Sequence, residues 1–200
     1  MYPLLESIRI QDGIIQNIDY HQQRVNISLQ VIGHQNKSTA LLDLINIPEE
    51  LSTGIVKCRF LYGAADDYSI HFTPYHKREI KLLHLINGKH LQYALKWANR
   101  DDINKLMKGM PSREDILITV DDQLTDTSYC NVAFNGAQGW ITPEFPLLKG
   151  TQRALLLNSG VLKTGNIKKE DLSQFTTIRL FNAMIPWDEA IELDINCIIY

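Results

Sequence analysis

Lys96 stands among apolar and aromatic residues, in the stretch LQYALKWANRDD at 91–102. Burial disfavours an ammonium, so a lysine held among such neighbours has its pKa pulled down from about 10.4, and its neutral amine becomes nucleophilic. Schiff-base chemistry needs such an amine. A lysine that packs its stem on apolar neighbours and keeps its charge in water is the commoner arrangement, and the local sequence leaves both open.

A carboxylate, Asp126, lies in the Thr- and Ser-rich segment TDTSYCN at 125–131. In such a segment an aspartate often bonds nearby backbone N–H groups and stabilises a turn. It could also face the protonated ring nitrogen of a cofactor and keep that ring an effective electron sink. The segment by itself is compatible with both roles.

Two further features could hold an anion. Gly150-Thr151 stand at the start of an apolar segment, where the first N–H groups and the helix dipole attract negative charge. Arg24 is either a surface charge or a clamp for phosphate, which suits the planar guanidinium. Together with Lys96 and Asp126, these residues supply the types of group that proteins use to bind pyridoxal 5′-phosphate (PLP). Composition and spacing alone do not establish a PLP site.

The first half of the chain predicts a hairpin followed by a helix. LLESIRI at 4–10 is typical of a strand, Asp12-Gly13 of a tight turn, and IIQNI at 14–18 of the returning strand. Asp19 and Gln22 have the spacing of a capping box, and Gly33 favours a helix end. Further on, we expect a helix at 37–52, a hairpin of strands at 54–63 and 67–75, and a strand at 78–86.

The second half predicts helices at 100–110 and 150–160 and strands at 115–120, 131–136 and 139–143, with a loop at 121–130. The C-terminal stretch from 176 predicts a strand, a turn, then a strand or short helix. Because strands dominate with a few helices, the fold class is α+β. The pattern breaks around Asn87-Gly88, so we place a domain boundary there: a small domain at 1–87 and a larger one at 88–200.

Composition excludes several classes of function. A formal net charge of −3 offers no electrostatic footprint for nucleic acid, and no apolar run is long enough to span a membrane. The N-terminus lacks the basic and apolar regions of a signal peptide. Three widely spaced cysteines favour reduced thiols in a cytoplasmic protein, and the histidine spacing predicts no metal site.

Four blocks that run over nearly the whole chain resemble the class IV (fold type IV) PLP-dependent aminotransferases and lyases. The blocks are ESIRIQDGIIQNIDYHQQRV, LKWANR, DDQLTDTSYCNVAFNGAQGWITPEFPLLKGTQRALLL and IRLFNAMIP. The order Lys, two spacers, Asn-Arg in LKWANR is similar to the 4-amino-4-deoxychorismate lyase branch. Branched-chain aminotransferases tend instead to carry Gly-Asn-Tyr after the lysine.

The resemblance assigns roles to individual residues. Lys96 would bind PLP and act as acid and base, and Asp126 would face the pyridine nitrogen. Asn99 and Arg100 would shape the substrate site, and Arg9 and His21 are further candidates for the substrate carboxylates. Contacts with the phosphate would come from Arg24, Thr151, Gln152, Asn182 and Ala183.

Three positions depart from the family pattern. Asp126 stands where the family usually has Glu, and Gln152 where a threonine hydroxyl is common. The run at 131–134 has its aromatic residue, Phe134, displaced by one position. The chain is also shorter than typical members, mainly in its N-terminal half. These departures bear on substrate choice more than on cofactor binding.

The resemblance implies a small N-terminal α/β sandwich and a larger, barrel-like C-terminal domain with PLP in the cleft between them. It implies conversion of 4-amino-4-deoxychorismate to 4-aminobenzoate and pyruvate through an external aldimine, in folate synthesis, by a cytoplasmic homodimer. A PLP-dependent aminotransferase of branched-chain or D-amino acids would use the same residues. A shortened, non-catalytic relative is the third alternative. We expect a small-molecule amino substrate and no nucleic-acid or membrane partner.

Overall fold

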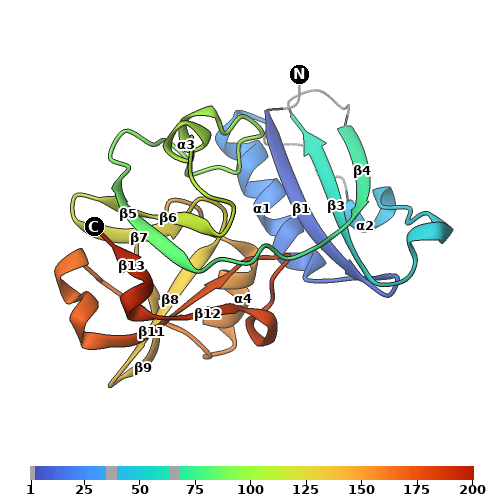
Figure 1. Ribbon diagram of the computed structural model, residues 1–200. Coiled ribbons are helices and arrows are strands. Elements are labelled where there is room, and N and C mark those ends of the chain that lie inside the picture. Colours follow the sequence, from blue (N-terminus) through green and yellow to red (C-terminus); the bar gives the residue numbers. More distant parts are fainter. Residues whose placement is uncertain (1–2, 35–39, 64–67) are drawn as a thin grey trace. The chain divides into compact units, whose positions relative to one another are not determined.

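The computed structural model describes residues 3–34, 40–63 and 68–200 and divides the chain into two compact units (Figure 1). The first unit comprises residues 1–77 together with 95–99, and the second comprises 78–94 and 100–200. The expected boundary at 87/88 differs from this division, since it falls inside the second unit. Lys96 consequently belongs to the first unit, in a short segment with which the chain returns to it.

The first unit is built on an antiparallel sheet of order β2-β1-β3-β4. Asp12 and Gly13 both have positive φ, 48° and 77°, as a two-residue hairpin loop requires, so the predicted turn is confirmed. The hairpin expected at 54–75 is also present. The strands are β1 (Leu4–Gln11), β2 (Ile14–Ile15), β3 (Ile55–Tyr62) and β4 (Tyr68–Pro74).

Helix α1 (Ile18–Val31) packs on one face of this sheet (Figure 1). The expected capping box is wrong: the helix begins one residue after Asn17, so Asp19 lies inside the first turn, where its charge still suits the dipole. Gln22 instead bonds Asn26 and the backbone of Leu41. The core between helix and sheet holds Leu4, Ile8, Ile10, Val25, Leu29 and Phe60.

The helix expected at 37–52 is much shorter in the structure. Only α2 (Leu41–Leu44) and a single 3₁₀ turn (Glu49–Leu51) form, and residues 37–39 lie outside the described residues. Pro48 explains the break, because proline lacks an N–H donor and disfavours the helical conformation in the residue before it.

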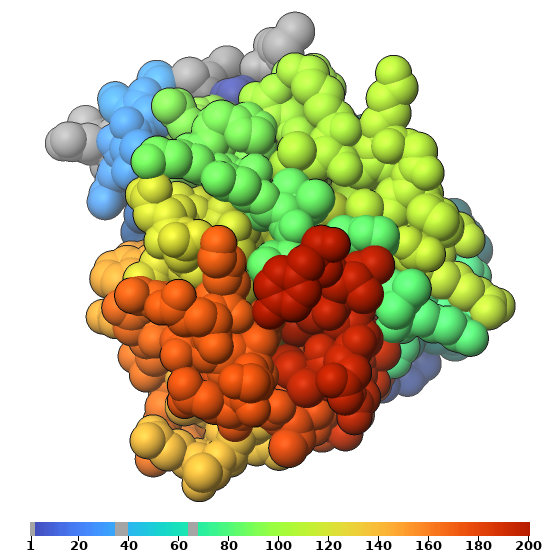
Figure 2. Space-filling model, turned by 60° about the vertical axis from the view of Figure 1, so that its left-hand side comes forward, coloured from blue at the N-terminus to red at the C-terminus, as the bar shows by residue number. Residues whose placement is uncertain are grey.

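The second unit is a nine-stranded mixed sheet of order β10-β9-β8-β7-β6-β5-β13, and β11 joins β8 to β12. Parallel strands β5 and β6 are separated in sequence by α3 (Asp101–Leu106). The C-terminal strand β13 pairs with β5, so the last residues (red) lie at the surface against the green segment (Figure 2). The strands are β5 (Leu82–Asn87), β6 (Glu114–Val120), β7 (Gln123–Thr127), β8 (Asn131–Gly136), β9 (Gly139–Pro143), β10 (Lys163–Gly165), β11 (Phe175–Phe181), β12 (Ile191–Asp194) and β13 (Ile198–Ile199).

Half of the segment 121–130, predicted as a loop, is a strand, β7. Asp121 and Asp122 both adopt positive φ and form a tight turn, which Val120 and Gln123 close as a strand pair. Aspartate tolerates this conformation better than most residues, so two aspartates mark a hairpin here rather than an open loop. Asp126 therefore lies in β7 and not in a flexible connection.

Helix α4 (Thr151–Asn158) follows Gly150 and ends before Gly160, as the sequence predicted. Short 3₁₀ turns at Lys169–Gln174, Trp187–Glu189 and Ile195–Cys197 complete the unit. Among the described residues, 39% lie in strands and 25% in helices, which confirms the expected α+β class. All three cysteines are free thiols. No helix among the described residues has the length and apolar character needed to cross a membrane.

Candidate active site

The backbone of Lys96 is fixed against β1. Its carbonyl accepts a hydrogen bond from the N–H of Leu5 at 3.0 Å, and Trp97 forms a bridge with Leu4. The N–H of Trp97 also bonds back to the carbonyl of Leu95 at 2.9 Å, which makes Lys96 the central residue of a γ-turn. Leu95 and Trp97 pack on the core of the first unit. The half-buried lysine therefore stands on a turn whose backbone is hydrogen-bonded to β1 and whose neighbours pack on the core.

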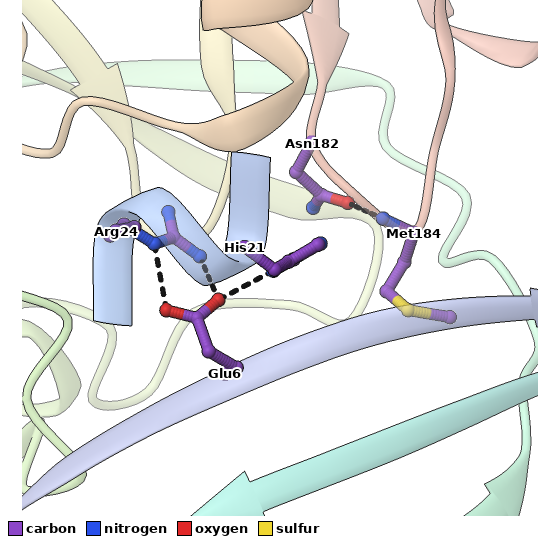
Figure 3. Close-up of polar contacts among 5 residues, drawn as sticks. All are labelled: Glu6, His21, Arg24, Asn182 and Met184. Atoms are coloured by element: carbon purple, nitrogen blue, oxygen red, sulfur yellow. Dashed lines mark hydrogen bonds and ion pairs between the residues drawn. The ribbon is translucent and has the colours of Figure 1, made fainter. Parts of the chain in front are cut away.

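Arg24, on α1, is held by a carboxylate that the sequence analysis had passed over (Figure 3). Its Nε donates to Oε1 of Glu6 at 2.8 Å, and its Nη2 donates to Oε2 of the same group. His21 Nδ1 lies 2.6 Å from that second oxygen. Glu6 and His21 have no exposed surface and Arg24 has 13% of its side chain exposed, so this Glu6–His21–Arg24 cluster is almost wholly buried.

The charges in this cluster are set by its members. Burial raises the pKa of Glu6, but the Arg24 guanidinium and the His21 hydrogen bond outweigh it and lower the pKa from 4.5 to about 2. Burial lowers the pKa of His21; Glu6 opposes this, while Arg24 and Lys96 lower it further. His21 is therefore neutral at pH 7 and donates its Nδ1 hydrogen to the ionised Glu6. The effect of Lys96 on His21 places the lysine charge within electrostatic reach of the cluster.

In the second unit, Asp126 occupies the point where two strands meet. Strands β7 and β8 are antiparallel, and Asp126 is paired with Asn131 across them. The Nδ2 of Asn131 donates to Oδ1 of Asp126 at 2.8 Å, and the N–H of Leu148 donates to Oδ2 at 2.8 Å. Burial outweighs these bonds and raises the pKa of Asp126 from 3.8 to about 7. A cation at this carboxylate would restore its charge.

Asn131 also links this carboxylate to the start of α4. It donates to the carbonyl of Leu148, and a Cβ on Gly150 would lie 2.0 Å from its Oδ1. Glycine is therefore required at this close approach. Thr151 and Gln152, the first helical residues, are both buried. The structure thus brings the predicted carboxylate and the predicted phosphate-binding helix start together through one asparagine.

Two other predicted residues hold the turn that follows Asp126. Arg100 donates to the carbonyl of Ser128, and Asn182 donates to the carbonyl of Tyr129 at 3.1 Å. The Oδ1 of Asn182 accepts from the N–H of Met184 at 2.8 Å, which closes the turn around Ala183 (Figure 3). The contacts of Arg100 and Asn182 with Ser128 and Tyr129 hold the backbone between β7 and β8, and the bond from Met184 holds the turn after β11.

The predicted residues fall into two groups. Arg24, Lys96 and Asn99 belong to the first unit; the second unit holds Arg100, Asp126, Thr151, Gln152, Asn182 and Ala183. Sequence reasoning missed Glu6 and Asn131. It named His21 as a candidate for the substrate carboxylates, and in the structure His21 contacts Glu6. A signal for Glu6 was present, because it interrupts the alternating apolar positions Leu4, Ile8 and Ile10 of β1. A carboxylate on the buried face of a strand predicts a buried cation.

The side chains present fit PLP chemically. Its aldehyde needs an amine, its ring nitrogen a carboxylate in an apolar setting, and its phosphate an arginine and backbone N–H groups. The first unit holds a candidate amine and a candidate arginine, and the second unit holds a candidate carboxylate and a candidate helix start. An α+β chain with this set of side chains has what a PLP-dependent enzyme of the fold-type IV kind requires.

The chain belongs to the amino-transferase class IV family, whose sequence model matches residues 4–188, and this family is PLP-dependent. An uncharacterized protein of Haemophilus influenzae is 34% identical over 188 residues, covering 92% of this chain and 98% of its own. A crystal structure from Haemophilus somnus 129pt, provisionally described as a 4-amino-4-deoxychorismate lyase, is 35% identical, with TM-score 0.85, covering 93% of this chain and 98% of that one. The PLP-bound form of a hypothetical aminotransferase from Mycobacterium tuberculosis, at 13% identity, TM-score 0.72 and coverage of 96% and 80%, shares the fold.

Proposed function

We propose that this chain is a PLP-dependent lyase that converts 4-amino-4-deoxychorismate to 4-aminobenzoate and pyruvate. The observation that carries the proposal is the likeness over nearly the whole chain to the Haemophilus somnus protein that is provisionally described as such a lyase. The order Lys96, two spacers, Asn99-Arg100 supports the lyase over an aminotransferase. We further propose a cytoplasmic homodimer that acts in folate synthesis.

Each proposed role follows from the chemistry of a residue. Lys96 would bind the cofactor through its aldehyde carbon and, as a free amine, would remove the proton from the substrate carbon that bears the amino group. Bound PLP would supply an electron sink for that carbon. Asp126 would stabilise positive charge on the nitrogen of the cofactor ring, because a nearby cation favours the ionised form of this buried carboxyl.

The proton balance of the reaction closes with Lys96 alone. Breaking the bond between the ring and the enolpyruvyl oxygen leaves an aromatic product, and the proton taken from the amine-bearing carbon is returned to the methylene carbon of the departing group, giving pyruvate. Arg24, Thr151 and Gln152 would hold the phosphate while Asn182 keeps the turn at Ala183 in place. Asn99 and Arg100 would border the substrate.

The test combines a spectrum with an assay. Purified chain reconstituted with PLP should absorb in the visible and should release 4-aminobenzoate and pyruvate in equal amounts from 4-amino-4-deoxychorismate. Lys96→Ala should lose both properties. After borohydride reduction, the cofactor mass should be found on the peptide that contains Lys96. Amino-group exchange with a 2-oxo acid in place of pyruvate release would identify an aminotransferase, and a chain that stays colourless with PLP would identify a non-catalytic relative.

A further inference from the structure

Glu6 is a charged residue on an otherwise apolar strand face. Leu4, Ile8 and Ile10, which alternate with it along β1, are core residues without exposed surface, and Glu6 itself has none. An isolated carboxylate is costly to bury, and it remains ionised only where charges and hydrogen bonds replace its water. The low pKa of Glu6 shows that its partners do so. A buried ion pair adds little stability compared with apolar side chains of similar volume, so the presence of this one calls for a reason beyond packing.

The geometry of the cluster fixes the direction of the guanidinium. Two parallel hydrogen bonds from Nε and Nη2 of Arg24 meet the two oxygens of Glu6 (Figure 3). A planar fork held in this bidentate way has its plane and its axis determined, in contrast to a lysine or a singly bonded arginine. Glu6 contacts the Nε side of the Arg24 guanidinium. The outer edge of the guanidinium, formed by Nη1 and the second Nη2 hydrogen, therefore points away from the carboxylate.

His21 supports the carboxylate in turn. It lies three residues before Arg24 on α1, on the same helix face, and donates to the oxygen of Glu6 that also receives Nη2. Because His21 is neutral, it orients Glu6 without adding charge. The cluster thus carries one negative and one positive charge.

We propose that Glu6 is a positioning residue that aims the guanidinium of Arg24 at the phosphate of the cofactor, with His21 holding Glu6 in place. This inference rests on the proposed function, in which Arg24 meets that phosphate. Preorganisation of this kind improves affinity by reducing the side-chain ordering that binding must otherwise impose.

A simpler role for Glu6, neutralising a buried arginine, predicts the opposite outcome. If Glu6 acts by charge alone, Glu6→Gln leaves Arg24 uncompensated and binding of an anionic phosphate becomes tighter. If Glu6 acts by position, glutamine can accept only one of the two hydrogen bonds that Arg24 donates to the carboxylate. The guanidinium is then held less firmly, and phosphate binding weakens. Glu6→Asp separates the two roles further, because it keeps the charge and withdraws the oxygens by one methylene.

The experiment compares PLP with pyridoxal, which lacks the phosphate. Dissociation constants of both are measured by absorbance on the full-length, cofactor-free chain, for the wild type, Glu6→Gln and Glu6→Asp. Glu192→Gln is the matched control, since it breaks an exposed pair with Arg179 on β11 and β12. Circular dichroism checks that each variant is folded, and Glu6→Asp keeps the test valid if Glu6→Gln does not fold.

The wild type should prefer PLP over pyridoxal, and both Glu6 variants should lower this preference about tenfold, which is the lower end of the loss seen when the residue behind a metal ligand is removed. Their affinity for pyridoxal should stay unchanged, as should both affinities of Glu192→Gln. In an Arg24→Leu background, Glu6→Gln should have no further effect on the preference. Glu6 variants that keep or increase the preference would overturn the positioning role alone. A wild type that binds neither molecule, or shows no phosphate preference, would overturn the proposed function together with it.

Discussion

Asp126 should make the stability of the cofactor-free chain fall as the pH rises. Its pKa is about 7 in the folded chain and 3.8 in its ordinary state, and burial is the main cause of the difference. Between these two values the folded state keeps a proton that the unfolded state releases. The stabilisation is therefore complete below pH 4 and is lost as the pH rises to about 7.

The size of this loss of stability follows from the pKa shift of Asp126. A difference of about three pKa units, at about 1.36 kcal/mol each, gives roughly 4 kcal/mol over the whole window. From pH 5 to pH 8 about two of those units are crossed, or roughly 3 kcal/mol. The pKa of His21 is lowered and acts with the opposite sign through its own range, so the wild-type profile alone does not isolate Asp126.

Asp126→Asn removes the titrating group and is the decisive comparison. Its side-chain oxygen can still accept from Leu148, but its amide would face the Nδ2 of Asn131, so at pH 5 we expect the variant to be less stable than the wild type. Residue 126 no longer titrates in the variant, so it adds no pH dependence to the variant's stability. The informative quantity is the change with pH in the difference between the two free energies of unfolding. Urea unfolding at pH 5 and pH 8 should give a difference between variant and wild type that narrows by roughly 3 kcal/mol at the higher pH.

The same gap at both pH values would refute the reasoning, because it would mean that Asp126 is already ionised in the folded chain. Added PLP supplies a second check. A protonated ring nitrogen beside Asp126 would lower its pKa, so the saturated wild type should lose most of this pH dependence while Asp126→Asn stays unchanged. If the stability of the PLP-saturated wild type kept the same pH dependence, the ring nitrogen would not lie beside Asp126.

Two further substitutions test the contacts that support the site. Gly150→Ala would put a methyl group 2.0 Å from Oδ1 of Asn131, so we expect a loss of about 1–3 kcal/mol in urea unfolding together with weaker PLP binding; unchanged stability would mean that α4 can shift freely. Asn182→Ala leaves the N–H of Met184 without its acceptor and should cost about 1–3 kcal/mol, whereas Asn196→Ala, on an exposed turn, should cost less than about 0.5 kcal/mol; equal losses would contradict the structural role of Asn182.

Much of the fold could be predicted from local pattern. The hairpin at Asp12-Gly13, the hairpin of β3 and β4, helix α4 and most strands of the second unit follow from turn residues and alternation that act within a few positions. The errors have local causes as well. Pro48 ended a helix whose apolar spacing looked continuous, and two adjacent aspartates formed a turn that a polar loop resembles. The capping box failed because the helix began two residues before its supposed first residue.

The candidate site also has features that the sequence determined and features that depend on the fold. The sequence alone determined which reactive groups the chain owns: the amine of Lys96, the carboxylate of Asp126, the guanidinium of Arg24 and the glycine before α4. These are properties of residue type, and the family likeness followed from them. Their order along the chain said nothing about which of them touch.

Only the tertiary structure decided how each group is held and charged. Glu6 and Arg24 are 18 residues apart, and Asp126 and Leu148 are 22 apart, yet each pair shares a hydrogen bond in a buried setting. Burial and distant partners determine whether a carboxyl is ionised, so two acids of nearly equal ordinary pKa are driven to about 2 and about 7. Desolvation and pairing arise only when the chain is folded, and no local pattern contains them.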